Sequence, residues 1–324
     1  MKEEYLLQAM LKGDVLALSK LISLVEDRAA PVPEMMAKLY PKLGKAQRIG
    51  VTGPPGAGKS TLVDRLTELF RKEGKKVGIL AVDPSSPFSG GAILGDRIRM
   101  QRHSTDEGVF IRSMSTRGSH GGLARATHEV AHLLDAFGFD VILIETVGVG
   151  QTELDVIDLA DTVVVVLVPE SGDSVQTMKA GLMEIADIFV VNKADRDGAT
   201  RLVADLHMLL GLVEIQPEWK TPILLTEAEN KKGIQELYQK IQERRQFLEN
   251  LEFRKGRRRQ HRRKELVGIL MDIFRERLLD EDERSPIGKI FQEVEAGEKN
   301  PYDAVIKILS DRETLVRIFK DERL

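Results

Sequence analysis

Residues 53–61 read Gly53-Pro54-Pro55-Gly56-Ala57-Gly58-Lys59-Ser60-Thr61. The part from Gly53 to Ser60 matches the pattern G-x-x-x-x-G-K-[ST], between an aliphatic run at 49–52 and a helical pattern that contains Leu62. Glycines let backbone N–H groups turn inward around phosphates, and the start of a helix adds partial positive charge. A purely structural glycine-rich turn is the alternative, but the full pattern in a strand–loop–helix context indicates a phosphate-binding loop. We expect Lys59 to reach the β- and γ-phosphates and the Ser60 hydroxyl to bind Mg²⁺.

Short aliphatic runs alternate with amphipathic stretches from residue 45 to about residue 248. The runs are Ile49–Thr52, Val77–Val82, Val109–Ile111, Val141–Ile144, Val163–Val168, Ile188–Val191 and Ile223–Leu225. Aliphatic strands that alternate with helices are typical of a parallel sheet covered on both faces. We therefore predict an α/β fold, a P-loop NTPase G domain with a mostly parallel central sheet over residues 43–248. Its ligand should lie at the carboxyl ends of the strands.

Helical patterns flank this domain. Residues 1–42 predict an N-terminal helical hairpin whose runs are separated at Gly13 and which ends at Pro31 and Pro33. Residues 249–324 predict a C-terminal helical region, with Asn300 as a helix cap followed by Pro301.

Apolar residues of the C-terminal region recur at helical spacing. Leu266, Leu270, Ile273 and Phe274 line one expected helix, and the last helix is expected to bury Val305, Ile308 and Leu309. A small helical tail cannot build a large core alone, so this region should pack on a neighbour or a second subunit.

Composition restricts the class of protein. Of 324 residues, 42% are hydrophobic and 31% charged, and the net charge is −3, which argues against a nucleic-acid-coating or lipid-coating function. The absence of cysteine excludes disulfides, Cys-zinc sites, iron–sulfur clusters and thiol catalysis. No aliphatic run approaches the roughly 20 residues that span a bilayer. We expect a cytoplasmic protein without membrane or nucleic-acid partners.

A second motif indicates the base of the nucleotide. Asn192-Lys193-Ala194-Asp195 follows the aliphatic run 188–191 and matches the N-K-x-D pattern of GTP-binding proteins. The carboxylate of Asp195 can accept hydrogen bonds from the ring N–H and exocyclic amine of guanine, whereas adenine offers no such edge. Lys193 is expected to lay its alkyl stem over the base, and Asn192 to tie the loops together. The motif favours GTP and GDP over ATP.

Acidic residues at strand ends are candidate Mg²⁺ ligands. Glu145 follows the run 141–144, where ordinary GTPases have Asp-x-x-Gly, and the N–H of Gly148 could sense the γ-phosphate. Asp83 directly follows the aliphatic run 77–82, and Asp96 lies further along the loop that comes after it. The alternative for Glu145 is a strand-end carboxylate that binds no metal, and the alternative for Asp83 and Asp96 is that they are solvated loop acids. No Gln follows Gly148 directly, so the usual water-positioning residue is absent from its usual position.

These residues resemble one family. The strings at 145–151, 83–87, 121–127 and 192–195 are similar to the MeaB/MMAA (ArgK-like) G proteins of the G3E class. The resemblance implies a GTP-hydrolysing chaperone that gates cofactor loading and protects or reactivates an adenosylcobalamin-dependent acyl-CoA mutase, typically methylmalonyl-CoA mutase. It also implies a homodimer joined through the C-terminal helices.

The resemblance assigns roles to further residues. Gln176 and Lys179 lie in a segment that resembles the third switch of the family and would join Lys59 and Asp83 as catalytic residues. Asp83, Asp96 and Glu145 match acidic positions used around magnesium. The guanine-side loop, usually Ser-Ala-x, reads Thr226-Glu227-Ala228 here, and Glu227 and Ala228 are its candidate contacts.

Other readings stay open beside this one. An ATPase or kinase of a periplasmic amino-acid (LAO/AO) transport system would require ATP preference, against which Asp195 argues. A metallochaperone would be expected to carry Cys or His clusters. The H-E-x-x-H spacing at 128–132 is more typical of a solvated helix face than of a zinc site. The basic run 254–264 lacks interleaved aromatics, so a solvated or partner-facing helix is favoured over a nucleic-acid site.

Overall fold

The computed structural model describes most of the chain. The described residues are 2–29, 31–83, 103, 105–115, 122–146, 159–169, 183–211, 218–249, 251–279, 285–312 and 315–316. The side chain of Asp83 and those of residues 251–261 lie outside this description. The chain divides into two compact units, Met1–Arg258 and Arg259–Leu324.

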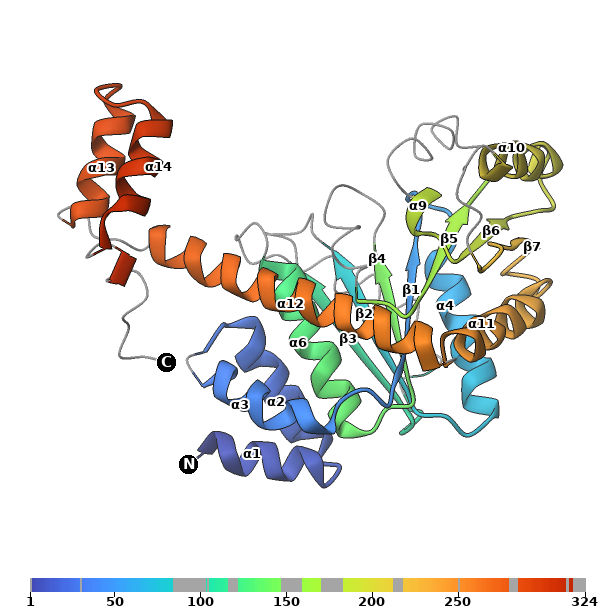
Figure 1. Cartoon of the computed structure of the whole chain (residues 1–324). Coiled ribbons are helices and arrows are strands. Elements are labelled where there is room, and N and C mark those ends of the chain that lie inside the picture. The colour runs from blue at the N-terminus through green and yellow to red at the C-terminus, as the bar shows by residue number, and fades with distance from the viewer. Residues whose placement is uncertain are drawn as a thin grey trace. The chain divides into compact units, whose positions relative to one another are not determined.

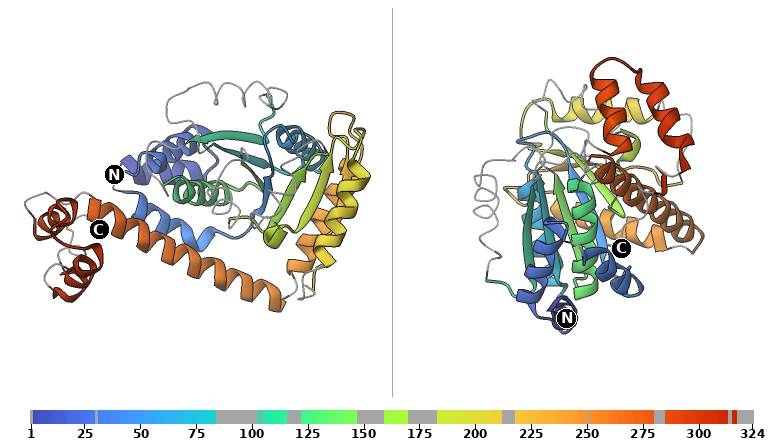
Figure 2. Two further views of the ribbon diagram at one scale, coloured as in Figure 1. Left: turned by 90° about the horizontal axis from the view of Figure 1, so that it is seen from above. Right: turned by 90° about the vertical axis from the view of Figure 1, so that its left-hand side faces the viewer.

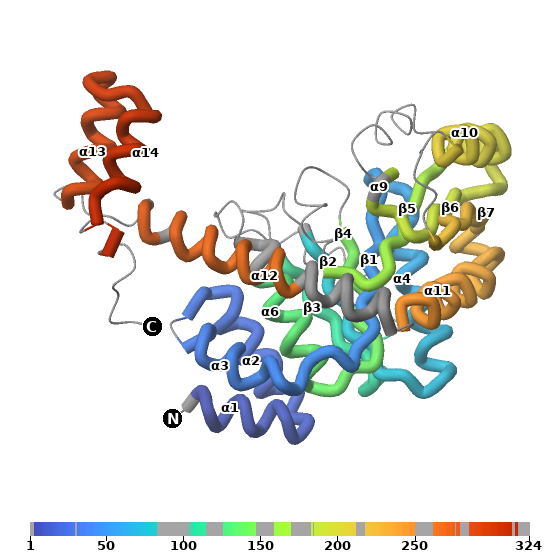
Figure 3. Tube along the Cα trace, in the orientation of Figure 1, coloured from blue at the N-terminus to red at the C-terminus, as the bar shows by residue number. Residues whose placement is uncertain are grey.

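In the described part of the first unit, a 7-stranded sheet has the order β3-β2-β4-β1-β5-β6-β7, and every pair of neighbours is parallel. The strands are β1 (Gln47–Thr52), β2 (Val77–Asp83), β3 (Val109–Ser115), β4 (Val141–Thr146), β5 (Thr162–Leu167), β6 (Ile188–Asn192) and β7 (Ile223–Thr226). The predicted parallel α/β fold is confirmed, and each aliphatic run coincides with a strand (Figure 1). β2, β3 and β4 lie on one side of β1, and β5, β6 and β7 lie on the other side, as can be followed along the tube in Figure 3.

Helices cover both faces of the sheet because successive strand residues point to opposite faces. On one face, Ile49 and Val51 pack with α4 (Lys59–Lys72) and α11 (Ile234–Glu249). On the other face, Leu80, Val82, Ile142 and Ile144 pack with α6 (Gly122–Phe137), and Val163 and Val165 with α10 (Ala199–Gly211). A single-turn helix, α9 (Met183–Ile185), precedes β6, and Figure 2 shows the covered sheet from two further directions.

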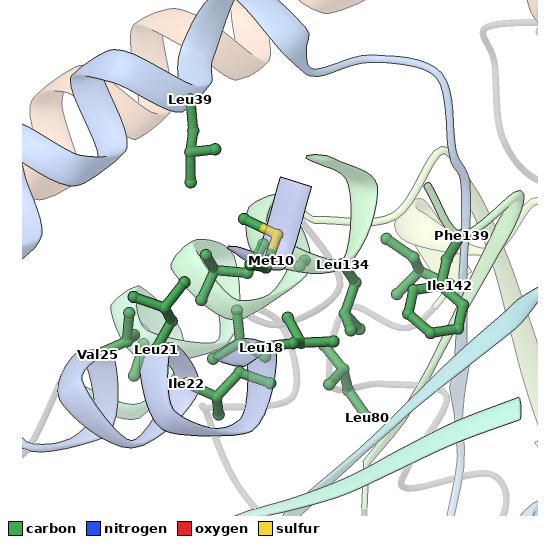
Figure 4. Close-up of a cluster of buried hydrophobic side chains, with 14 of the residues drawn as sticks. Met10, Leu18, Leu21, Ile22, Val25, Leu39, Leu80, Leu134, Phe139 and Ile142 are labelled. Carbon is green, nitrogen blue, oxygen red and sulfur yellow. The ribbon is translucent and has the colours of Figure 1, made fainter. Parts of the chain in front are cut away.

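The N-terminal helices pack against α6. They are α1 (Lys2–Leu11), α2 (Val15–Glu26), α3 (Val32–Leu39) and the short 3-10 helix η1 (Tyr40–Lys42). Asp14 caps α2 by accepting hydrogen bonds from the backbone N–H groups of Leu16 and Ala17 at 2.8 and 3.0 Å. Leu18, Leu21 and Ile22 of α2 are buried in one cluster with Leu134 of α6 (Figure 4).

The expectation that Pro31 and Pro33 end the N-terminal hairpin is wrong. α2 already ends at Glu26, and the two prolines lie at the N-cap and in the first turn of α3. Proline is well tolerated there because the first-turn N–H groups have no partner within the helix. The hairpin of α1 and α2 is therefore followed by a third helix.

The second unit contains most of α12 (Leu251–Leu279), with α13 (Pro286–Glu295) and α14 (Pro301–Ser310). The predicted start of α14 is confirmed, since the Asn300 side chain accepts a hydrogen bond from the Asp303 N–H at 2.9 Å. Within the single chain, Val305 and Leu309 are exposed, contrary to the expected burial, and the small core of the described residues consists of Ile287, Ile290, Ala304 and Ile308. Among the described residues, none of the helices has an apolar stretch sufficient to cross a bilayer.

Candidate nucleotide-binding site

The phosphate-loop motif forms the turn between β1 and α4. Gly53 and Gly58 have φ of 137° and 89°, a region that glycine adopts without steric cost. A Cβ atom on Gly53 would lie 2.0 Å from the carbonyl oxygen of Val166, and one on Gly58 would lie 2.3 Å from the Asn192 amide nitrogen. Glycine at these two positions lets the loop approach β5 and the loop after β6.

Lys59 lies at the start of α4 and is buried. Its Nζ donates hydrogen bonds to the backbone carbonyls of Gly53 and Pro54 at 2.8 and 3.0 Å. The ammonium group is thereby held across the loop rather than extended into solvent. It is positioned to act on an anion that the loop encloses.

Two of the predicted magnesium ligands are brought together. The Ser60 hydroxyl donates a hydrogen bond to Oε1 of Glu145 at 2.6 Å, and Glu145 is buried near the end of β4. Next to them, the Thr146 hydroxyl donates to that of Thr52 at 2.9 Å. Hydroxyl and carboxylate oxygens are the donors that Mg²⁺ prefers, and Mg²⁺ commonly uses one or two protein oxygens together with substrate phosphates. Ser60 and Glu145 therefore fit this ion.

Asn192 joins three loops at the carboxyl end of the sheet. Its amide nitrogen donates to the carbonyl of Ala57 at 2.8 Å, so the phosphate loop is tied to the loop after β6. Its amide oxygen accepts from the Thr226 hydroxyl at 2.9 Å and from the Ala228 N–H at 3.1 Å. Asn192 is buried, and these bonds use both ends of its amide.

The remaining residues of the Asn192–Asp195 loop are more accessible. Asp195 is exposed, and Lys193 has a positive φ of 56°, which gives the loop a sharp turn directly after β6. Ala194 donates its N–H to the carbonyl of Thr226 at 3.0 Å. The Asp195 carboxylate is therefore available beside a loop whose backbone is fixed from two sides.

Glu227 has a different environment from the one expected of a base contact. Its carboxylate accepts hydrogen bonds from Asn230 and Lys232, each at 3.0 Å, which lower the pKa of Glu227. The side chain thus closes its own loop, and the buried Ala228 next to it provides the link to Asn192.

Other expected site residues cannot be placed in this arrangement from the described part of the chain. Asp96, Gly148, Gln176 and Lys179 lie outside the described residues. Only the backbone of Asp83 is described. Asp83 is the last residue of β2, which lies two strands from β1, and the sheet is parallel, so Asp83 lies at the same carboxyl end of the sheet as the phosphate loop.

One buried network near the site has no sequence motif. Arg65 on α4 donates from Nε to the carbonyl of Ala228 at 3.2 Å, and its Nη1 lies 2.8 Å from Glu68 and 3.5 Å from Asp64. His103 Nε2 lies 3.0 Å from Asp64, and this hydrogen bond raises the pKa of His103 against an opposing effect of burial. Charged residues on an amphipathic helix normally face solvent, so no spacing signals this cluster.

The H-E-x-x-H residues lie on α6 away from the phosphate loop. Nδ1 of His132 lies 3.0 Å from the Arg48 guanidinium, and the ring packs edge-on against Tyr40. Asp135, one turn further on, accepts hydrogen bonds from the N–H groups of Gly44, Lys45 and Ala46 at 2.6 to 3.1 Å. This cluster holds the segment between η1 and β1, which is a structural function.

A parallel sheet with a phosphate loop after its central strand, tied by Asn192 to a second loop of N-K-x-D sequence, defines a P-loop protein of the guanine-nucleotide-binding type. The family model described as methylmalonyl Co-A mutase-associated GTPase MeaB matches residues 18–283. The chain belongs to this family and is a GTPase that binds guanine nucleotides.

Relatives from an archaeon, a bacterium and a mammal support this assignment. A Pyrococcus abyssi protein named as a GTPase is 50% identical over 309 residues, which span 94% of this chain and 95% of the relative. The GTPase ArgK of Escherichia coli is 39% identical over 71% of this chain and 72% of its own. The mouse mitochondrial methylmalonic aciduria type A homolog is 36% identical over 78% of this chain and 66% of its own.

A solved structure shares the architecture. It is described as a LAO/AO transport system kinase, and it is 28% identical, with a TM-score of 0.67 over 94% of this chain and 96% of its own.

Proposed function

We propose that this GTPase is a chaperone that gates cofactor loading and protects or reactivates an adenosylcobalamin-dependent acyl-CoA mutase of the methylmalonyl-CoA mutase type. The observation that carries the proposal is the match of residues 18–283 to a family described as mutase-associated GTPases. The mouse relative, which is named after methylmalonic aciduria, supports the same partner.

Guanine is recognised by the loop after β6. The Asp195 carboxylate accepts the ring N–H and the 2-amino group, and the Lys193 stem lies over the base. Asn192 keeps this loop in register with the phosphate loop through its bond to Ala57. Glu227 acts through loop closure and Ala228 through its link to Asn192.

The phosphate loop performs the electrostatic part of the reaction. Its backbone N–H groups bind the phosphates, and the Lys59 ammonium stabilises charge that develops on the β- and γ-phosphates during hydrolysis. Water attacks the γ-phosphorus, the bond to the β-phosphate oxygen breaks, and GDP and phosphate leave. Ser60, Asp83, Asp96 and Glu145 hold Mg²⁺, which when bound neutralises phosphate charge. The Gly148 N–H senses the γ-phosphate.

Hydrolysis by the chain alone is slow on this proposal, because no glutamine follows Gly148 to position the attacking water. Gln176 and Lys179 act as the missing catalytic groups when the mutase is bound. The partner therefore controls the rate, in the way that activating proteins control other GTPases.

A homodimer joined through the C-terminal helices completes the proposal. The second unit has a core of only a few buried side chains, whereas Tyr302, Val305, Ile306 and Leu309 form an exposed apolar stripe on α14. These positions follow the spacing of one helix face. A second copy of the chain would remove this stripe from water.

The test is GTP turnover by the pure protein with and without an adenosylcobalamin-dependent mutase from the same cell, with ATP as the control. We expect the mutase to stimulate GTP hydrolysis about tenfold or more and ATP to be inert. Lys59→Ala should abolish tight Mg-GTP binding in calorimetry, and Gln176→Ala or Lys179→Ala should remove the stimulation while basal turnover persists. Absence of stimulation, or a preference for ATP, would contradict the proposal and favour a transport kinase like the one named for the solved relative.

A further inference from the structure

Arg65 is a buried cation on α4, in the second turn after the phosphate loop. A buried guanidinium is stable only when its N–H groups are hydrogen-bonded and its charge is paired. The Glu68 carboxylate at 2.8 Å and the Asp64 carboxylate at 3.5 Å supply the charge. The Nε–H is directed instead to a neutral group, the Ala228 carbonyl at 3.2 Å.

That carbonyl belongs to a residue held on both of its backbone polar atoms. The Ala228 N–H donates to the Asn192 amide oxygen at 3.1 Å, while its carbonyl accepts from the Arg65 guanidinium and, at 3.3 Å, from the Lys231 N–H. Ala228 is itself buried, so its N–H cannot exchange Asn192 for water at low cost, and of the two donors to its carbonyl only Arg65 comes from α4. The position of Arg65 is thereby transmitted to Asn192, and Asn192 contacts the phosphate loop at Ala57.

A second contact joins the same loop to α4 at the surface. Lys231 Nζ lies 2.8 Å from Glu68, but Lys231 is 58% exposed. Exposed ion pairs contribute little, whereas a buried hydrogen bond from a charged donor contributes more. Of the two contacts, the one made by Arg65 is therefore the one that fixes the loop.

We propose that Arg65 is a positioning residue for guanine recognition. It holds the loop after β7, residues 227–233, on α4, and through Asn192 it keeps the Asp195 carboxylate in register with the phosphate loop. The inference rests on the proposed assignment of Asp195 to the guanine base. It predicts a larger effect on the base than on the phosphates, because Arg65 reaches the phosphate loop only through Ala228 and Asn192, whereas the bonds of Lys59 to Gly53 and Pro54 hold that loop independently.

The experiment measures dissociation constants of the full chain for GDP, ADP and pyrophosphate by calorimetry. Arg65→Met, which keeps the alkyl stem and removes all donors, should raise the Kd for GDP about tenfold and leave the Kd for pyrophosphate within about twofold. The preference for GDP over ADP should fall by the same factor. At saturating GTP, kcat should be nearly unchanged while KM rises.

Matched variants separate positioning from general loss of structure. Lys231→Met removes the exposed contact to the same loop and should change the Kd for GDP by less than about twofold. Arg65→Lys keeps the charge but not the fork of donors, so we expect an intermediate effect. In an Asp195→Ala background, Arg65→Met should have little further effect, because the group that Arg65 positions is then absent.

Each outcome of these measurements supports or contradicts the proposed role of Arg65. Equal weakening of GDP, ADP and pyrophosphate by Arg65→Met, or no weakening of GDP, would overturn the role of Arg65. If Asp195→Ala leaves the preference for GDP intact, the guanine assignment itself fails, which is a separate result. If Arg65→Met does not fold, Glu68→Gln, which removes the carboxylate that orients Arg65, should raise the Kd for GDP but not for pyrophosphate. Failure of Glu68→Gln to do so would also overturn the role.

Discussion

At the scale of single residues, the proposed function assigns the choice of base to Asp195. A carboxylate presents two acceptors, which match the ring N–H and the 2-amino group of guanine. Xanthine has an oxygen in place of that amino group. A side chain that binds xanthine in the same way must therefore replace one of the two carboxylate oxygens with a hydrogen-bond donor. An asparagine amide offers one acceptor and one donor pair on the same frame.

Asp195→Asn should therefore weaken GDP binding about 100-fold and improve binding of xanthosine diphosphate. Competition calorimetry with both nucleotides measures the two changes. The exposed Asp197 provides the control, since Asp197→Asn changes a neighbouring charge without the same backbone position. Equal loss of both nucleotides in Asp195→Asn would contradict the assignment.

His103 provides a pH-dependent contribution to stability. The hydrogen bond to Asp64 raises the pKa of His103 in the folded protein, with a further attraction from the Glu68 charge. A raised folded-state pKa means that the pair stabilises the fold at pH below the unfolded pKa, and that this stabilisation is lost as pH rises through the folded pKa.

The free energy of unfolding of His103→Gln should thus fall below that of the parent by more at about pH 6 than at about pH 9. Urea unfolding at the two pH values measures the difference. His207→Gln on α10, where the side chain is exposed, is the matched control for replacing an imidazole by an amide. A deficit of equal size at both values would indicate that His103 contributes through packing alone.

The separation of interacting residues along the chain explains why the motifs of the site could be predicted and the Arg65 network could not. The phosphate loop and the 192–195 loop are continuous in sequence, and each carries its chemistry within a few residues. Arg65 and Ala228 lie 163 positions apart, and tertiary packing, in which α11 contacts both α4 and β7, brings them together. A charged residue on a helix gives no sign that its partner is a distant carbonyl.

At the scale of elements, the strands were predictable because a strand covered on both faces must be aliphatic throughout. β4 and β5 are buried at every position. Their sequences are almost entirely aliphatic and lack the polar face of an amphipathic helix. The third N-terminal helix was not predictable in the same way, since Pro31 and Pro33 are compatible with both the end of one helix and the start of the next. The faces of α14 could not be assigned either, because apolar residues lie on both.

Asp135 determines how the N-terminal helices connect to the sheet. Its side chain is fully buried and accepts three backbone hydrogen bonds from residues 44–46. Asp135→Asn keeps the shape but replaces one acceptor by a donor, so backbone N–H groups lose a partner. We expect a loss of about 2–4 kcal/mol in the free energy of unfolding.

Urea unfolding followed by circular dichroism measures this loss. Glu236→Gln, which neutralises an exposed carboxylate on α11, should change stability by less than about 0.5 kcal/mol. If the two variants are equally stable, Asp135 does not hold the connecting segment.

At the scale of the whole molecule, the proposed dimer makes a prediction about α14. Ile306→Arg combined with Leu309→Arg places two charges in the exposed apolar stripe and should convert a dimer into a monomer in analytical ultracentrifugation. Basal GTP turnover per chain should stay the same, because the nucleotide site lies in the first unit. Glu295→Arg, on the exposed surface of α13, is the charge control. An unchanged dimer in the double variant would place the interface elsewhere.

The central position of β1 also has a consequence for synthesis of the chain. β1 ends at Thr52, yet its two neighbours are β4 and β5, which are complete only at Thr146 and Leu167. At ribosomal rates of roughly 5–20 residues per second, both edges of β1 stay without their partners for on the order of ten seconds. The strand that carries the phosphate loop is thus the first strand made and the one that waits longest for both of its partners, and the nascent chain must be kept from pairing with other chains during that interval.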